Sequence, residues 1–290
     1  MKKLNSILFI TILSIFSIVN AQSLNIPPAS PSQMLTQQFA TSNIEISYSR
    51  PAARERVVFG EVVPFDKLWR TGANSATTIA FGEDVTIDGK NIEKGKYGLL
   101  TIPGKTNWTI IITKDTNVTS ERAYKQANDV LRVTVPVKSL NQHVENFTIS
   151  VENIQKEQAD IVLSWEKTLV SFTVKTEVDS KIMAEIAEVL EKDNRPYFAA
   201  ARYFYDNDKD LNKALEWVNK AVEQRPDAFW MTHQKAKILM KLKKYNEAIA
   251  AAEVSKKQAA AIDYAEYVKL NDNLIAEIKS QPGFKPSKKK

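Results

Sequence analysis

The chain has 290 residues, of which 40 are lysine or arginine and 34 are aspartate or glutamate, so its formal net charge is +6. It has no cysteine, which excludes disulfides and cysteine-ligated metals. Its eight glycines are too few for glycine-rich cofactor loops, and its charges are too mixed in sign for the basic stripe of a nucleic-acid-binding protein.

The first 21 residues have the layout of a cleavable secretory signal peptide. A pair of lysines opens the segment, an uncharged apolar run extends from Leu4 to Val19, and Ala21 closes it. The run is shorter than the ~20 residues that span a bilayer comfortably. We therefore expect cleavage before Gln22, export of a mature chain without a transmembrane segment, and a location in the periplasm, or else at the cell surface or outside the cell.

A β-rich region follows the signal. Residues 22–41 are polar, include three prolines and are predicted to form an extended lead-in. Apolar and polar residues then alternate, first in residues 44–49, and this period of two predicts half-buried strands. About nine strands with short turns close best as an antiparallel sandwich, which we place at residues 42–177. The later predicted strands lie at residues 77–81, 85–92 (a hairpin), 97–102, 108–113, 130–137, 147–154, 161–165 and 169–174.

Two local features refine this region. Asp88-Gly89 stands between two apolar segments and predicts a type I′ hairpin turn, because both turn positions need a positive φ angle. Residues 119–128 lack the β pattern and are predicted to be a helical insert.

Residues 178–280 have the apolar spacing of helices and almost no β signal. Leu211–Leu215 matches Tyr245–Ile249 at an offset of 34 residues, a period at which helix–turn–helix content resembles the tetratricopeptide repeat. In that pattern Ala214 and Ala248 are the small residues where paired helices approach closely.

The two repeat units need neighbours that cover their ends. Helices predicted at residues 180–192 and 263–278 would cap the array. The lysine-rich residues 281–290 are expected to form a disordered tail. The predicted fold class is therefore an α+β multidomain protein, with an N-terminal antiparallel β-sandwich followed by C-terminal α-helical tetratricopeptide-like repeats.

Catalytic and metal-binding motifs are missing from the sequence. His143 and His233 lie in different predicted domains, without cysteine or a second histidine at ligand spacing. No Gly-x-Ser-x-Gly, His-Glu-x-x-His or phosphate-loop motif occurs. We expect no catalytic residue, metal or cofactor and lean away from an enzyme, although paired carboxylates, which are recognised only in space, stay open.

One loop concentrates side chains that are suited to hold a ligand. It offers an aromatic ring, a guanidinium, a hydroxyl and an amide within six residues, namely Trp69, Arg70, Thr71 and Asn74. Stacking and forked donors suit a sugar or a small carboxylate. The same residues also suit a structural role, with Trp69 in the core and the others shaping the turn. Tyr48 and Arg50 join the candidate ligand-binding set if their strand lies beside the loop.

Four motifs stand in order along the β region: Ser47–Pro51, Trp69–Asn74, Gly95–Gly104 and Trp108–Ile111. Together with Asp129–Val133, they resemble the family called domain of unknown function 2911, over roughly residues 30–176. The resemblance implies an exported β-rich protein of Gram-negative bacteria, often with appended helical repeats. It brings no established reaction, so no catalytic residue is carried over.

Three functions are compatible with these observations. The first is an exported, non-catalytic binding or scaffold protein of the bacterial envelope, with a protein partner on the helical repeat. The second is binding of a carbohydrate or small carboxylate by the β region through the loop Trp69–Asn74. The third is a hydrolase that uses paired carboxylates. No nucleic-acid partner is expected.

Overall fold

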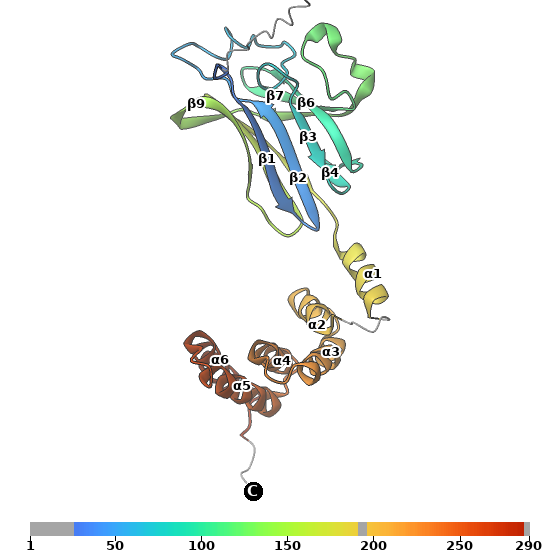
Figure 1. The fold of residues 1–290 in the computed structure, drawn as a ribbon, viewed down its shortest axis with the longest axis vertical. Helices are drawn as coiled ribbons and strands as arrows, with labels where there is room; N and C mark the ends of the chain where they lie inside the picture. Colours follow the sequence, from blue (N-terminus) through green and yellow to red (C-terminus); the bar gives the residue numbers. More distant parts are fainter. Residues whose placement is uncertain (1–25, 191–195, 287–290) are drawn as a thin grey trace, which may run out of the picture. The chain divides into compact units, whose positions relative to one another are not determined.

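The computed structural model describes residues 26–190 and 196–286 (Figure 1). The chain divides into two compact units, Met1–Thr176 and Glu177–Lys290, which we call the β unit and the helical unit. The signal peptide predicted for residues 1–21 lies outside the described residues. None of the helices in the described ranges has the length and apolar character that crossing a bilayer requires.

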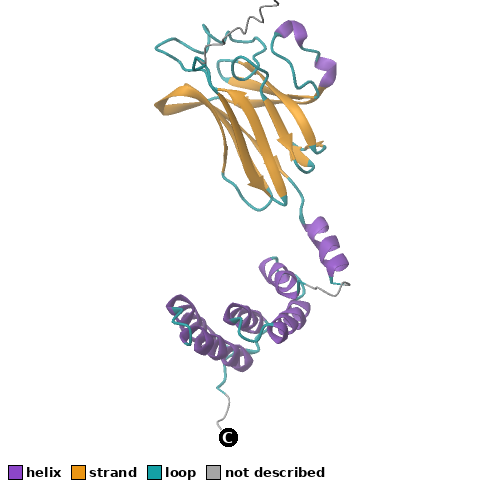
Figure 2. Ribbon diagram, viewed as in Figure 1, coloured by secondary structure: helices purple, strands orange, loops and turns teal. Residues whose placement is uncertain are grey.

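The β unit is a sandwich of two antiparallel sheets, as predicted (Figure 2). The larger sheet has the strand order β1-β2-β3-β6-β7-β8, and the smaller has the order β5-β4-β10-β9. The larger sheet consists of β1 (Ser32–Phe39), β2 (Ser42–Ser49), β3 (Thr78–Phe81), β6 (Gly95–Pro103), β7 (Asn107–Thr113) and β8 (Asp129–Pro136). The smaller consists of β4 (Val85–Ile87), β5 (Lys90–Ile92), β9 (Lys138–Glu152) and β10 (Gln158–Lys175).

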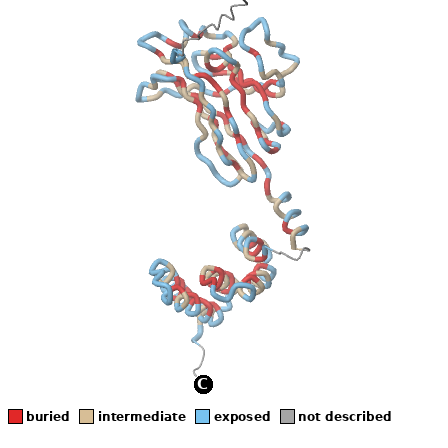
Figure 3. Tube along the Cα trace, in the orientation of Figure 1, coloured by how far each residue is buried: buried red, intermediate tan, exposed pale blue. Residues whose placement is uncertain are grey.

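The core lies between the two sheets. Alternate residues of β2, such as Ile44 and Ile46, belong to the same buried cluster as Phe147 of β9 and Phe172 of β10. Figure 3 shows buried residues along the strands and exposed residues in most loops of the β unit. Burying this apolar surface from both sheets is the main stabilising contribution to the unit, at about 25 cal/mol per Å².

The predicted lead-in is partly wrong, because residues 32–39 form strand β1. This strand pairs along its whole length with β2, from Ser32 opposite Ser49 to Phe39 opposite Ser42. Its side chains are mostly polar, and Met34 is 73% exposed. β1 is an edge strand held largely by backbone pairing, and backbone pairing leaves little trace in apolar periodicity.

The turn prediction at Asp88-Gly89 is confirmed. Ile87 pairs with Lys90, so the two residues between them make the hairpin turn of β4 and β5. Their φ angles are 50° and 73°, both positive, as a type I′ turn requires.

Strand β10 reverses direction near Glu166, whose φ is 50°. Thr173 donates a hydrogen bond from Oγ1 to Asp160 Oδ1 at 2.6 Å, although the two residues are 13 positions apart. A straight strand would separate them by ~40 Å. The Thr176 N–H also donates to Glu157 O at 2.9 Å, in the same register. β10 is therefore a hairpin, and its two arms contain the separate strands predicted at residues 161–165 and 169–174.

The predicted insert at residues 119–128 contains no α-helix. Two single-turn 3-10 helices, Glu121–Ala123 and Gln126–Asn128, occupy it, and neither has a side-chain cap. Only two side chains of the surrounding segment 114–128 pack on the outer face of the large sheet, Val118 and Tyr124, so an amphipathic helix has no stripe to bury there.

The helical unit has six α-helices among the described residues. Leu211 begins α3 and Tyr245 begins α5, so these helices start 34 residues apart. Ala214 and Ala248 are both fully buried. Membership of the tetratricopeptide repeats stays a prediction. The helices are α1 (Asp179–Val189), α2 (Tyr197–Asp206), α3 (Leu211–Gln224), α4 (Phe229–Lys241), α5 (Tyr245–Ala260) and α6 (Ala265–Lys279).

The tail predicted to be disordered at residues 281–290 is partly ordered. Phe284 packs against the cluster formed by α4, α5 and α6, and Asn246 Nδ2 donates to Lys285 O at 3.1 Å. An aromatic side chain that covers apolar helix surface fixes this part of the tail, whereas residues 287–290 lie outside the described range.

Candidate functional site

Trp69 lies in the core of the β unit and is only 9% exposed. Its backbone pairs with Thr101 of β6, and its Nε1 donates to Gly72 O at 3.0 Å. Ring centroids of four other aromatic residues lie 4.9 to 6.1 Å from the Trp69 ring, namely Phe59, Trp108, Phe147 and Trp165. These neighbours cover the ring, so it has no free face on which a sugar could stack.

Thr71 and Asn74 shape the loop. Both have positive φ angles, 57° and 55°. Thr71 is fully buried and donates from Oγ1 to Thr101 Oγ1 at 3.1 Å. Asn74 donates from Nδ2 to Ser30 O at 3.0 Å and so holds the segment that leads into β1. The Thr71 hydroxyl and the Asn74 amide nitrogen are therefore engaged within the protein.

Tyr48 and Arg50 join the two sheets. The Tyr48 hydroxyl accepts a hydrogen bond from the N–H of Ile149 in β9 at 2.9 Å, and burial raises the pKa of Tyr48. Arg50 donates from Nε to Phe147 O at 3.0 Å and from Nη2 to Thr148 Oγ1 at 2.7 Å. Neither residue lines the cavity beside Arg70. Their strand lies beside the predicted ligand loop, since a Cβ at Gly72 would lie 3.0 Å from Ser49 O, but their side chains bond to β9 and stay outside the cavity.

Arg70 is the predicted residue that faces a cavity. It lines a space of about 170 Å³ on the outer face of the large sheet, together with Leu68, Trp69, Leu100, Val118, Thr119 and Ser120. Its Nη1 donates to Asn74 O at 2.7 Å, the single hydrogen bond found for this side chain among the described residues. Because a guanidinium carries five N–H donors, most of its capacity is available to a ligand.

A larger cavity of about 390 Å³ shares Thr119 with the first. We call the two together the outer groove. The second cavity is lined by hydroxyl groups, one amide and one ammonium, from Ser47, Ser75, Ala76, Thr78, Lys96, Thr116, Asn117 and Thr119. Its floor is the outward face of β2, β3 and β6, where Ser47 pairs with Thr78 and Ala80 pairs with Lys96.

The wall of the outer groove is the segment 114–128 between β7 and β8. Val118 anchors it on Leu100 and Ile111. Gly98 of β6 allows the close approach, since a Cβ there would lie 2.2 Å from Asp115 O. At the other end, Asn128 Nδ2 donates to Asp115 Oδ2 at 2.7 Å. The wall is therefore fixed at both ends.

A polar cluster continues this anchoring into β8. Arg132 Nη1 lies 2.6 Å from the Tyr124 hydroxyl and 3.0 Å from Asp129 Oδ2, and Tyr124 also donates to Asp129. Burial and the Asp129 carboxylate raise the pKa of Tyr124 to about 12. The neutral phenol is thus the form that holds the end of the wall.

The electrostatic character of the outer groove is cationic. Arg70 and Lys96 both line it, and no carboxylate is among its lining residues. Neither cation has an ion pair within residues 26–190 and 196–286. Two unpaired cations among hydroxyl and amide groups can hold a small anion that also carries hydroxyl groups.

Sequence reasoning missed Lys96, Asn117 and Thr119, which are remote in sequence from the loop at Arg70. The sequence did contain one sign that another segment packs on this face of the sheet. Gly98 stands in an otherwise β-rich segment, and a glycine inside a strand often marks the close approach of another backbone.

The described residues contain no group of three or more His, Asp or Glu side chains placed to hold a metal ion. A carboxylate-dependent hydrolase needs two acids that face each other across a cavity. Asp88 is the one acid in the lining of one cavity and Glu247 the one acid in another, while the outer groove has none. These cavities therefore do not offer such a pair.

Comparison with known proteins gives one match. No curated protein and no solved structure resembles the chain closely enough to match it. The family model described as "Protein of unknown function (DUF2911)" matches residues 30–174, which is half of the chain and includes every strand of the sandwich except the last residue of β10. The chain belongs to the DUF2911 family.

Proposed function

We propose that this is an exported, non-catalytic binding protein whose β unit holds a small carboxylated, hydroxyl-rich ligand, of the sugar-acid class, in the outer groove. The observation that carries the proposal is the pair of unpaired cations, Arg70 and Lys96, in a groove without a carboxylate. Hydrogen bonds to charged groups contribute ~1.5–3 kcal/mol each, enough to make the carboxylate the main determinant of affinity.

The lining hydroxyl groups favour a sugar acid over a simple anion. Ser47, Thr78 and Thr116 each offer a donor and an acceptor to the ligand's own hydroxyl groups. Neutral sugars gain much of their affinity by stacking on an exposed aromatic face, and the buried ring of Trp69 offers none. The charged end of the ligand must therefore supply the affinity.

Calorimetric titration with D-glucuronate and D-glucose tests this function. We expect saturable binding of glucuronate alone, weakened about tenfold or more by Arg70→Gln or Lys96→Gln, as the loss of a charged hydrogen bond requires. Lys90→Gln, on an exposed lysine of β5, is the matched control and should leave the affinity unchanged. Equal binding of glucose and glucuronate, or an equal effect of the three variants, would contradict the proposal.

Export rests on the sequence of residues 1–21. Expression of the full chain in a Gram-negative host should yield a mature protein that begins at Gln22 and is released by osmotic shock. A cell-associated product that retains Met1 would show that the segment is not processed and would remove export from the proposal.

We also propose a protein partner for the helical unit. A cavity of about 370 Å³, largely apolar, lies between α3, α4 and α5. Thr232 lines it and its hydroxyl has no hydrogen-bond partner among the described residues, while Val254 beside it is 50% exposed.

A photo-cross-linker at position 254 should give a discrete adduct in envelope extracts. The same group at Ile262, exposed but outside the cavity, should give none; adducts at both positions or at neither would reject this surface.

A further inference from the structure

The smaller sheet of the β unit has an interruption beside the second arm of β10. Leu169 pairs with Lys138 of β9, and Lys175 pairs with Thr86 of β4. Between these contacts, residues 170–173 have no ladder partner on this side in the described part of the chain. The interruption is four residues long, or ~13 Å.

The backbone of β10 directs hydrogen-bonding groups into the interruption. The Thr176 N–H donates to Glu157 O, on the other arm of the hairpin. In an antiparallel strand alternate residues pair to opposite sides, so Ser171 and Thr173 direct their N–H and C=O groups away from that arm. They point to the side where Lys138 and Thr86 pair with β10 at either end. The second arm of β10 therefore has an unpaired stretch of backbone, with β9 paired to it at one end of the stretch and β4 at the other.

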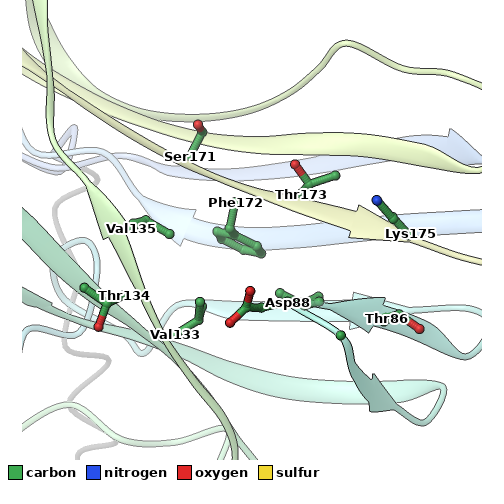
Figure 4. Close-up of a pocket in the computed structure, with 11 residues that line it drawn as sticks. Thr86, Asp88, Val133, Thr134, Val135, Ser171, Phe172, Thr173 and Lys175 are labelled. Atoms are coloured by element: carbon green, nitrogen blue, oxygen red, sulfur yellow. The ribbon is translucent and has the colours of Figure 1, made fainter.

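This edge faces a cavity of about 440 Å³ (Figure 4). The cavity is lined by Ser171, Phe172 and Thr173 on one side and by Val133, Thr134 and Val135 of β8 on the other. The valines and Phe172 supply apolar surface. A volume of this size lies in the range of small-ligand sites.

Charged groups of opposite sign mark the two ends of the interruption. Asp88, in the turn of β4 and β5, lines the cavity level with Thr173, and no hydrogen bond or ion pair is found for its carboxylate within the described residues. Lys138 stands at the other end, opposite Leu169. Lys175, also in the lining, adds donors for carbonyl oxygens.

We propose that this slot binds a short extended peptide with a free N-terminus. The peptide lies antiparallel to the second arm of β10 and pairs its backbone with Ser171 and Thr173, which completes the ladder by strand addition. Its terminal ammonium meets the carboxylate of Asp88, and its C-terminal carboxylate lies toward Lys138. Three residues, ~10 Å when extended, fit the length of the interruption.

Binding of Ala-Ala-Ala to the full chain, followed by calorimetry and by amide NMR shifts, tests the proposal. We expect saturable binding with a dissociation constant below about 10 mM, with shifts at the amides of Ser171 and Thr173. Asp88→Asn should weaken binding about tenfold and keep the fold, since Asn-Gly suits the same type I′ turn. Arg70→Gln, in the outer groove, is the control and should have no effect.

Two modified peptides separate this mode from loose association. N-acetyl-Ala-Ala-Ala lacks the ammonium, and an analogue with an ester in place of the amide between the second and third residues lacks one ladder donor. Both should bind more weakly than Ala-Ala-Ala by about tenfold. Equal affinity for the acetylated peptide, shifts confined to other amides, or no saturation up to 10 mM would each overturn the proposal.

Discussion

The indole N–H of Trp69 donates to the carbonyl oxygen of Gly72, three residues later, at 3.0 Å. This bond folds the loop back over the aromatic ring that anchors it. A Cβ at Gly72, where φ is 152°, would lie 3.0 Å from Ser49 O, so the loop also fits tightly against β2. Trp69 is thus anchored in the core, and the next residue of the loop, Arg70, brings a guanidinium to the lining of the outer groove.

Replacement of Trp69 should therefore affect stability, and replacement of Arg70 should affect binding. We expect Trp69→Ala to lower the free energy of unfolding by about 3–5 kcal/mol, as for other buried aromatics. Arg70→Ala should cost less than about 0.5 kcal/mol. Urea denaturation followed by circular dichroism measures both. A larger loss for Arg70→Ala than for Trp69→Ala would contradict the structural roles assigned here.

A methyl group at position 98 should displace the wall of the outer groove. The Cβ of Gly98→Ala would lie 2.2 Å from Asp115 O and 2.9 Å from Thr113 Cγ2, so the segment 114–128 has to move. Overpacking of this kind costs about 1–3 kcal/mol. Hydrogen exchange should quicken in residues 114–128 and glucuronate affinity should fall. The control is Ala80→Ser, a small change at a partly exposed position on the neighbouring strand β3, which should leave both quantities unchanged. Gly89→Ala is unsuitable as a control because the φ angle of Gly89 is 73°. Unchanged exchange in the segment would show that the close contact is not a constraint.

Features that depend on a few adjacent residues were predictable from the sequence. Features that depend on residues distant in sequence coming together in the fold were not. The turn at Asp88-Gly89 follows from two residues alone, so it was predicted correctly. β1 is a polar edge strand whose partner, β2, and not its own side chains, decides its conformation. Trp69 was recognised as important, but residue type alone does not reveal which side of a sheet it faces. Lys96 enters the outer groove only because the sheet brings β6 beside the loop at Arg70.

The pH dependence of stability should carry a contribution from Tyr124. Its pKa is raised from 10.0 to about 12, first by burial and then by the hydrogen bond to Asp129. As the pH rises, the unfolded chain therefore loses this proton before the folded protein does. The contribution of Tyr124 to the free energy of unfolding is complete below about pH 10 and is lost as the pH rises through about 12. The difference in unfolding free energy between the wild type and Tyr124→Phe should shrink between pH 9.5 and 11.5.

A matched variant isolates this effect from the other tyrosines, since Tyr124 is one of nine in the chain. Asp129→Asn removes the carboxylate that, together with burial, raises the pKa of Tyr124, so in that background the effect of Tyr124→Phe should change less with pH. The same pH dependence of Tyr124→Phe with and without the Asp129 carboxylate would show that the proton of Tyr124 is not held by Asp129.

A buried polar network should control the stability of the helical unit. Asn271 of α6 is fully buried; its Nδ2 donates to Ser255 Oγ at 2.9 Å and to Tyr267 O at 2.7 Å, and its Oδ1 lies 2.9 Å from His233 Nδ1. These bonds join α4, α5 and α6. Asn271→Ala leaves the buried hydroxyl of Ser255 and the half-buried ring of His233 without this partner, at about 1–3 kcal/mol for an unsatisfied buried group.

Hydrogen exchange measured by mass spectrometry locates this loss. With Asn271→Ala we expect faster exchange in α4, α5 and α6, and unchanged exchange in the β unit, because mutations without shared partners act independently. Ser255→Ala removes only one arm of the network and should give a smaller change in the same helices. Equal exchange in wild type and Asn271→Ala would mean that apolar packing by Leu274, Ile275 and Ile278 alone holds α6 in place.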